Sequence, residues 1–282
     1  MHQITAGSYA ITALSDGLSR LPPMFFPGLD PCSRDSGLDA DGTVHIPTGC
    51  FLVRGAGRTI LVDAGLGPLT LPYPDGMPAA RAAGDEPAPP LSEGGRLPGQ
   101  LRAAGCDPAQ VDTVFLTHLH GDHTGWIAPG GIPYFASADV IFHAADWALV
   151  EAASDADPGI AGLKAARDAG RLTTIDTFSR QLAPGLTIEH APGHTPGSCI
   201  LVAGSGSERA YLLGDVVQHP LQLNDTSISF LTDADAAKAA LTRTALLRRL
   251  QEEGAAIGMD HFPGTAFQRI AGGSTRIWQP QR

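Results

Sequence analysis

The chain has 282 residues, of which 43% are hydrophobic and 17% charged, a composition typical of a soluble globular protein with enough material for one large domain. Its formal net charge of -10 at pH 7 argues against a nucleic-acid partner, because phosphate binding requires clustered Lys and Arg. The sequence has no apolar stretch near the roughly 20 residues of a membrane helix, and its N-terminus lacks the features of a secretory signal.

The cysteines are widely spaced and form no CxxC pair: Cys32, Cys50, Cys106 and Cys199. This spacing favours reduced thiols in a cytoplasmic protein over a disulfide framework, and it argues against zinc–sulfur ligation.

The N-terminal part is predicted to hold strands separated by irregular segments. Residues 8–16 and 50–65 have strand patterns, and Gly55-Ala56-Gly57 marks a hairpin turn in the second. Residues 19–49 contain several prolines, and residues 67–95 are still richer in Pro and Gly. Both segments are predicted to be irregular, either as covers over a functional site or as disordered insertions.

From residue 97 onward the pattern alternates between helices and strands. Helices are expected at 97–105, 144–153 and 159–170, and strands at 111–116 and 140–143. Residues 186–215 predict a strand, a loop and a hairpin that turns at 204–209, and 255–259 predict a last strand. This alternation favours a single layered α/β domain that covers residues 1–282.

The clearest predicted helix covers residues 233–253. Asp233 is the expected N-cap and Gly254 the expected end. The predicted apolar face consists of Ala237, Ala240, Leu241 and Leu247. A basic group on the same helix is interpreted as a solvated face rather than a nucleic-acid patch: Arg243, Arg248 and Arg249.

Potential metal ligands follow four of the predicted strands. They are His118, His120, Asp122 and His123 after the first, His194 after the second, Asp215 after the third and His261 after the last. Strand ends in α/β architectures gather ligands at one edge of a sheet, so these side chains are expected to converge. By contrast, His45, His143 and His190 are expected to be ordinary surface or core residues.

The spacing of the cluster at 118–123 predicts two ions rather than one. His118 and His120 are two residues apart in an extended segment and point the same way, so they can bind one ion. Gly121 allows a sharp turn, after which Asp122 and His123 begin a helix directed at a second ion. Nitrogen and oxygen donors of this kind suit Zn²⁺, with Mn, Fe or Co as alternatives, and the two oxygens of Asp215 suit a bridge.

The motifs THLHGDH, APGHTPGS, LLGD and MDHFPG, together with ILVDAG at 60–65, resemble those of the metallo-β-lactamase superfamily of hydrolases over nearly the whole chain. The resemblance implies a four-layer αββα sandwich with the metal site at one edge of its two sheets. It assigns His118, His120 and His194 to the first metal, Asp122, His123 and His261 to the second, and Asp215 to both. Asp63 is expected to orient these ligands through hydrogen bonds without binding a metal ion itself.

The same resemblance implies hydrolysis by a hydroxide that bridges two divalent ions, with Asp122 as a candidate proton shuttle to the leaving group. Asp215 argues against a β-lactamase, because the zinc β-lactamases lack Asp at the bridging position. His120 argues against the nitric-oxide and oxygen reductases, which have Glu there. A lactone or related carboxylic ester is the favoured substrate. Organophosphate, aryl-ester and thioester hydrolysis are the alternatives, and a non-hydrolytic redox or metal-binding role is the alternative from another class.

One departure concerns the lactone. Acyl-homoserine lactonases of the best-known type have a Tyr shortly after the bridging Asp, whereas this chain has Val-Val-Gln-His after Asp215. The candidate substrate contacts are His219, Phe25 and Phe26, with Leu71 and Tyr73 in the cover segments and Trp126 and Trp147 near the metal motif. If they face the site they predict a hydrophobic pocket for a small ester or lactone. The alternative for the apolar residues is a core or dimer contact, so a lid and a homodimer both stay open.

Overall fold

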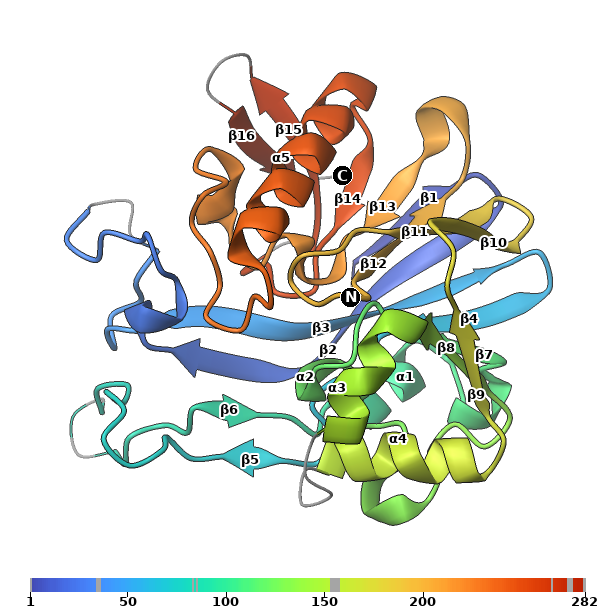
Figure 1. Cartoon of the computed structure of the whole chain (residues 1–282), viewed down its shortest axis with the longest axis horizontal. Helices are drawn as coiled ribbons and strands as arrows, with labels where there is room; N and C mark the ends of the chain where they lie inside the picture. Colours follow the sequence, from blue (N-terminus) through green and yellow to red (C-terminus); the bar gives the residue numbers. More distant parts are fainter. Residues whose placement is uncertain are drawn as a thin grey trace.

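The computed structural model describes residues 2–33, 37–82, 84, 86–152, 158–264, 266–272 and 276–280. Two β-sheets pack face to face in its centre, and helices cover the outer face of each sheet (Figure 1). This arrangement confirms the expected four-layer αββα sandwich. Among the described residues, the structure contains no helix with the length and apolar character needed to span a bilayer.

The first sheet has the strand order β5-β6-β2-β3-β4-β7-β8-β9, with β1 beside β2. Its strands are β1 Gln3–Ala6, β2 Tyr9–Leu21, β3 Val44–Gly55, β4 Arg58–Val62, β5 Thr70–Leu71, β6 Ser92–Glu93, β7 Thr113–Phe115, β8 Asp139–His143 and β9 Leu172–Ile175. The strands β4, β7, β8 and β9 run parallel to one another, so their carboxyl ends lie on one rim.

The second sheet has the order β10-β11-β12-β13-β14-β15-β16. Its strands are β10 Ser179–Ala183, β11 Leu186–His190, β12 Cys199–Ala203, β13 Ala210–Leu212, β14 Ala256–Gly258, β15 Phe267–Gly272 and β16 Arg276–Pro280. The pair β13–β14 is parallel, and both strands are followed by predicted ligands.

Three apolar layers hold the sandwich together. Between the sheets, side chains such as Phe51 and Phe115 pack against Ile188 and Leu201. The outer face of the first sheet is covered by α1 (Leu97–Ala103), α3 (Trp147–Ala152) and α4 (Pro158–Asp168). The outer face of the second sheet is covered by α5 (Ala236–Glu253), whose Leu247 and Leu250 are fully buried. Burial on both faces explains why the central strands are apolar throughout.

The two segments predicted to be irregular are partly strand. β2 continues to Leu21 and β3 begins at Val44, so 19–21 and 44–49 belong to the first sheet. Pro47 does not break β3, because the alternating burial of Val44, Ile46 and Thr48 fixes the strand around it. The segment 67–95 contains the short strands β5 and β6, and residues 34–36, 83 and 85 lie outside the described residues.

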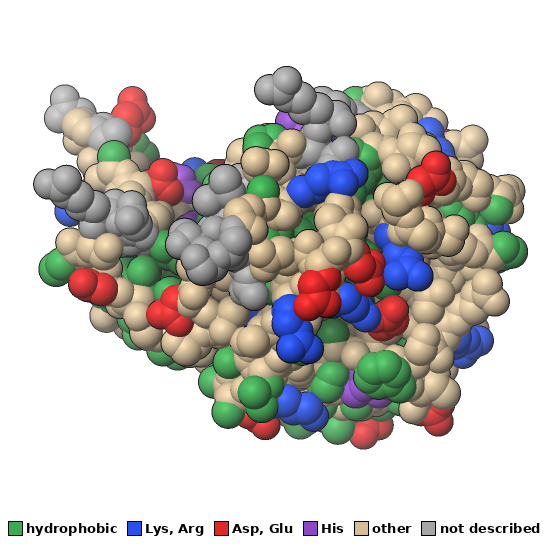
Figure 2. Space-filling view, turned by 90° about the horizontal axis from the view of Figure 1, so that it is seen from above, with side chains coloured by type: hydrophobic (Ala, Val, Ile, Leu, Met, Phe, Trp, Pro, Cys, Tyr) green, Lys and Arg blue, Asp and Glu red, His purple; other side chains and the backbone are tan. Residues whose placement is uncertain are grey.

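The ends of β2 and β3 project from the body of the molecule (Figure 1). The space-filling view shows a hollow in the surface on this side of the molecule (Figure 2). On the face in Figure 2, acidic and basic side chains are interspersed rather than gathered by sign. The strands β1, β9, β10, β15 and β16 were not predicted, because short amphipathic strands without a turn signal have weak sequence patterns.

Helix α5 differs from its prediction at its start and on its buried face. Asp235 is the N-cap, and its side chain accepts a hydrogen bond from the Lys238 backbone N–H, so the predicted cap at Asp233 is wrong. Gly254 ends the helix in the left-handed conformation, as predicted. Leu241 is 72% exposed, whereas Arg243 is 0% exposed. Of the predicted apolar face, Leu247 is buried as expected, but Ala237 and Leu241 are exposed. The solvated interpretation of Arg243 is wrong, because the second sheet packs on the stripe that contains Leu246 and Leu250.

Candidate metal centre

Loops after strands of both sheets bring the predicted ligands to one rim of the sandwich. They are His118 and His120 after β7, Asp122 and His123 in α2 (Gly121–Thr124), His194 between β11 and β12, Asp215 after β13 and His261 after β14. His120 has extended backbone and Gly121 begins α2, so the chain turns at the predicted position. The side chain of Asp122 is 30% exposed, whereas those of His123 and His261 are at most 2% exposed.

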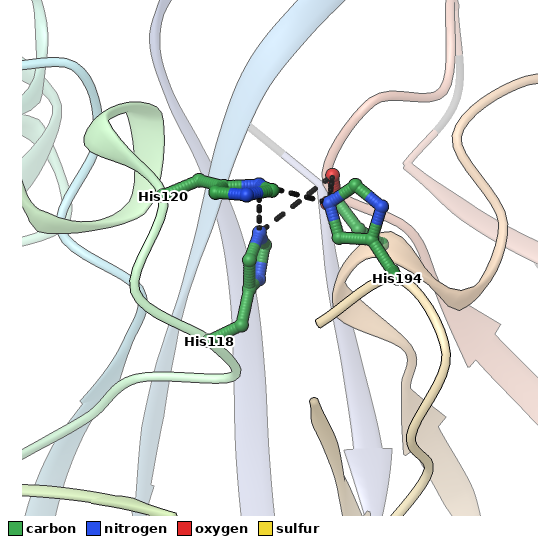
Figure 3. A group of neighbouring side chains, drawn as sticks. His118, His120 and His194 are labelled. Carbon is green, nitrogen blue, oxygen red and sulfur yellow. Dashed lines mark hydrogen bonds and ion pairs between the residues drawn. The ribbon is translucent and has the colours of Figure 1, made fainter. Parts of the chain in front are cut away.

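The first group consists of His118, His120, His194 and one oxygen of Asp215. The three imidazole rings face one another from two loops (Figure 3). His120 Nδ1 lies 3.1 Å from His118 Nε2 and 2.9 Å from His194 Nε2. Asp215 Oδ2 lies 3.2 Å from His194 Nε2. Ligands about 2.0–2.1 Å from a tetrahedral ion are separated by roughly 3.3 Å, so this spacing fits a metal ion.

The second group consists of Asp122, His123 and His261. Asp122 Oδ1 lies 3.8 Å from His123 Nε2, and Asp122 Oδ2 lies 3.6 Å from His261 Nε2. Asp215 Oδ1 lies 3.2 Å from His123 Nε2 and 3.0 Å from His261 Nε2. The two carboxylate oxygens of Asp215 therefore face different groups, as a bridging ligand requires. His45, His143 and His190 lie outside both groups, as expected.

Orphaned polar atoms support the fit to metal ions. His123 Nε2 and Asp215 Oδ1 are buried and have no hydrogen-bond partner among the residues that the structure describes. Burying such atoms without a partner is unfavourable, and a cation would satisfy both. Burial raises the pKa of Asp215, but the imidazoles of His261 and His123 lower it more, so the pKa lies well below its usual value. Burial and the neighbouring His123 hold the pKa of His118 well below its usual range, which keeps that imidazole neutral. An ionised carboxylate and a neutral imidazole are the ligand forms that bind metals.

The sequence pattern of the Metallo-beta-lactamase superfamily matches residues 46–261, a range that includes both donor groups. The chain belongs to the metallo-β-lactamase superfamily. All the predicted ligands lie at the strand ends of its sandwich, on the rim where the two sheets meet.

Curated relatives in this superfamily include an N-acyl homoserine lactonase from Bacillus sp, which is 27% identical over 169 residues. The N-acyl homoserine lactonase AiiB from Agrobacterium fabrum is 28% identical over 180 residues. Each match covers 60% of this chain, and 63% and 62% of those relatives, so the chain spans less than two thirds of their length.

Solved structures extend the similarity of fold to the whole chain. The chain is similar to AidC, a dizinc quorum-quenching lactonase in complex with a product, with a TM-score of 0.81 and 20% identity. It is also similar to the hydrolase AbOPH, with a TM-score of 0.80 and 22% identity. Both comparisons cover 100% of this chain and 97% of the other.

Asp63 occupies the supporting position that the superfamily motif implied. Its backbone has φ 59°, and its carboxylate accepts hydrogen bonds of 2.8 Å from the backbone N–H and from the hydroxyl of Thr117. Asp63 Oδ2 also lies 2.9 Å from His123 Nδ1. The carboxylate thus holds the segment before His118 and orients the ring of His123.

Other supporting contacts were not predicted from the sequence. Asp233 Oδ1 lies 2.8 Å from His194 Nδ1, and the carbonyl oxygen of Pro47 lies 2.7 Å from His261 Nδ1. Asp146 accepts hydrogen bonds from Thr195 Oγ1 and the Gly197 backbone N–H, which fixes the loop that carries His194. No local spacing signals these pairs, because each joins residues that are distant in the chain.

A cavity of about 300 Å³ opens beside the two donor groups. His120, Gly121, Asp122 and Asp215 lie at one side of it, and the rest of the lining consists of Ser19, Leu21, Phe25, Ile46, Leu66, Leu71, Leu91, Ser92, Phe230 and Thr232. Phe25 and Leu71 thus face the cavity, which is one of the two alternatives that the sequence left open. The lining is mostly apolar, as expected for a site that binds an apolar ligand.

Two of the predicted substrate contacts lie behind the cavity wall instead. Phe26 is 1% exposed and His219 is 5% exposed, and the ring centroids of the two are 5.8 Å apart. Phe26 also packs against Phe230 at 5.2 Å, so it supports a wall residue rather than lining the cavity. Trp126 donates its indole N–H to Asp16 and belongs to the core of the first sheet. Adjacent aromatic residues in an irregular segment give no sequence signal for which one turns inward.

Proposed function

We propose that this protein is a dinuclear metal hydrolase that opens lactones or cleaves related carboxylic esters. The observation that carries the proposal is that the two carboxylate oxygens of Asp215 face different donor groups. Asp215 Oδ2 lies 3.2 Å from His194 Nε2, and Asp215 Oδ1 lies 3.0 Å from His261 Nε2. The curated relatives named as N-acyl homoserine lactonases support a lactone as the substrate.

The residues present fit two divalent ions, with zinc proposed first and Mn, Fe or Co as ions that the same donors accept. His118, His120 and His194 would hold one ion, Asp122, His123 and His261 the other, and Asp215 both. Such a pair of ions makes hydroxide available near neutral pH and polarises the carbonyl oxygen of a substrate.

The chain itself contributes a proton carrier and a shaped cavity. Asp122 is the most suitable carrier, because its carboxylate lines the cavity and is 30% exposed. In our proposal it transfers a proton to the leaving oxygen of the substrate. Phe25, Leu71 and Phe230 provide an apolar wall that takes the acyl or aryl part of the substrate and excludes water.

Aryl esters and organophosphates form the second candidate class, with thioesters as a further alternative. The position that carries Tyr in acyl-homoserine lactonases of the best-known type is not filled by a hydroxyl here. Gln218, three residues after Asp215, is 0% exposed and donates its amide to the Asp215 carbonyl oxygen. The aromatic rings of Phe25 and Phe230 on the cavity wall suit an aryl leaving group as well as an acyl chain.

The cysteines are unpaired in the described part of the chain, which supports a reducing compartment, and we propose the cytoplasm. The proposed substrate is a small hydrophobic ester or lactone. The proposed assembly is a homodimer, and measuring the molecular mass in solution tests it.

Elemental analysis of the purified protein, followed by turnover of a γ-lactone and a p-nitrophenyl ester with and without chelator, tests the proposal. We expect about two ions per chain and cleavage that stops when the ions are removed. Cleavage that persists without metal would overturn the proposal. A fully loaded protein that cleaves neither compound but reacts with oxygen through a flavin partner would favour the redox alternative.

A further inference from the structure

A row of four side chains crosses the wall of the cavity from strand to strand. Ile46 on β3 pairs with Ser19 on β2, Ser19 pairs with Ser92 on β6, and Ser92 pairs with Leu71 on β5. All four line the cavity that also contains His120, Asp122 and Asp215. The row is apolar at both ends and carries two hydroxyl groups in the middle.

The two hydroxyls are bonded to each other and leave one hydrogen free. Ser19 Oγ lies 2.7 Å from Ser92 Oγ, and each serine is 7% exposed. A pair of hydroxyls carries two hydrogens, and the bond between them uses one. In the described part of the chain, neither hydroxyl makes a further hydrogen bond. The remaining hydrogen is therefore available to an acceptor that enters the cavity.

The apolar surroundings of the serine pair favour a ligand that carries such an acceptor. Leu21 and Phe25 line the same cavity, and their side chains are apolar. An acceptor for the free hydroxyl hydrogen must therefore come from water or from a bound ligand. A buried hydroxyl donor without a partner is unfavourable, and a ligand group that accepts its hydrogen removes that penalty.

The row also lies close to the donor groups. Ile46 is adjacent to Pro47, whose carbonyl oxygen accepts a hydrogen bond of 2.7 Å from His261 Nδ1. A substrate whose scissile carbonyl is at the donor groups therefore extends its chain along a wall that begins apolar and becomes polar at the serines.

We propose that Ser19 and Ser92 form a specificity-determining subsite that binds a carbonyl, amide or hydroxyl group on the otherwise apolar chain of the substrate. This inference rests on the proposed function and narrows its substrate class to lactones or esters with a polar acceptor in the chain. A plain alkyl lactone has nothing to offer the free hydroxyl hydrogen.

Two lactones of matched length test the subsite. N-octanoyl homoserine lactone carries an amide between ring and alkyl chain, and α-nonyl-γ-butyrolactone carries methylene groups in its place. We expect the double variant Ser19→Ala/Ser92→Ala to lower kcat/KM for the amide lactone by about tenfold, mainly through KM, with a much smaller change for the alkyl lactone. Each single variant should lose less, because the hydroxyl that remains keeps its own hydrogen and can still donate it to the substrate.

Binding of the non-hydrolysable lactam analogue of the amide lactone, measured by calorimetry, gives a readout that does not depend on turnover. We expect its affinity to fall by the same factor in the double variant. Ser15→Ala is the matched control, since Ser15 lies on the same strand but its hydroxyl faces the Gly17 carbonyl and a different cavity.

The outcomes separate this inference from the proposed function. If the unmodified protein cleaves neither lactone, the proposed function fails. If it cleaves both, and the double variant changes the two rates equally or changes neither, the proposed function stands and the polar subsite is refuted.

Discussion

Asp233 connects the metal centre to the wall of the substrate cavity through His194. Its Oδ1 lies 2.8 Å from His194 Nδ1, and its Oδ2 accepts a hydrogen bond of 2.9 Å from the backbone N–H of Phe230. The guanidinium of Arg243 lies 4.0 Å away and donates to the carbonyl oxygens of Val216 and Ile228. One buried carboxylate therefore fixes both the tautomer of His194, a proposed metal ligand, and the position of an aromatic wall residue.

Replacing Asp233 by Asn should weaken metal binding without unfolding the protein. The amide retains the shape of the carboxylate but loses the charge that favours the N–H form of His194 Nδ1. Loss of such a partner typically lowers metal affinity by about 10–100-fold. Competition with a chromophoric chelator measures this affinity directly.

Asp235→Asn is the matched control, because Asp235 is the N-cap of α5 and lies two residues from Asp233. Asn is also a good N-cap, so the free energy of unfolding should change little and the metal affinity not at all. Equal metal affinities for the two variants would show that Asp233 has no role in orienting His194.

The contrast between Asp233 and the ligands shows what the sequence can predict. The proposed ligands gather because each follows a strand, and the carboxyl ends of parallel strands lie at one rim whatever their loops do. Asp233 precedes a helix, so its local pattern equally fits an N-cap, and the contact with His194 spans 39 residues. Nothing in the local pattern distinguishes the two roles. Contacts of the loop 224–233 with the segment 25–27 and with Arg243, which are distant in the chain, decide between them.

Truncation of Phe25 should affect substrate binding, whereas truncation of Phe26 should affect the stability of the fold. Phe25 lines the cavity, so Phe25→Ala should raise KM for a long acyl chain more than for a short one. Phe26 is 1% exposed and packs in the cluster with Val44 and Ile46, so Phe26→Ala should lower the free energy of unfolding by about 3–5 kcal/mol. Urea unfolding and a series of acyl chain lengths measure the two effects. A selective chain-length effect in Phe26→Ala but not in Phe25→Ala would show that the assignment of the two rings is reversed.

The same pair marks the limit of prediction for the cover segments. Composition correctly predicted an irregular stretch here, since 22–33 and 37–43 lie outside the strands. The composition overestimated the length of the irregular segment. Residues 44–49 form a strand despite Pro47, because the side chains of β3 are buried in alternation there. Which of two adjacent rings turns to the cavity depends on Phe230 and His219, which are distant in sequence and became known only from the structure.

Asp122→Asn should lower kcat while leaving metal content close to that of the unmodified protein. The amide still offers an oxygen near His123 and His261, at the positions now 3.8 Å and 3.6 Å from their Nε2 atoms. It can no longer accept and return a proton, and general acid–base catalysis of this kind contributes about 10²–10⁴-fold. Elemental analysis and single-turnover kinetics are the measurements. Full turnover with full metal content would exclude Asp122 as the proton carrier.

His219 should make the protein sensitive to acid. Burial lowers its pKa from 6.5 to about 4, so the folded state binds its proton at lower pH than the unfolded state does. The contribution of neutral His219 to the free energy of unfolding is therefore complete above pH 6.5 and is lost as the pH falls through about 4. Its full size is on the order of 3 kcal/mol.

In His219→Asn the side-chain oxygen can still accept from the Leu221 backbone N–H, which now donates to His219 Nδ1 at 3.3 Å. We expect urea unfolding of this variant to lose less free energy between pH 6.5 and pH 4 than the unmodified protein does. The metal-ligand histidines are common to both proteins, so their titration cancels in the difference. Two parallel curves over that range would mean that His219 does not cause the acid sensitivity.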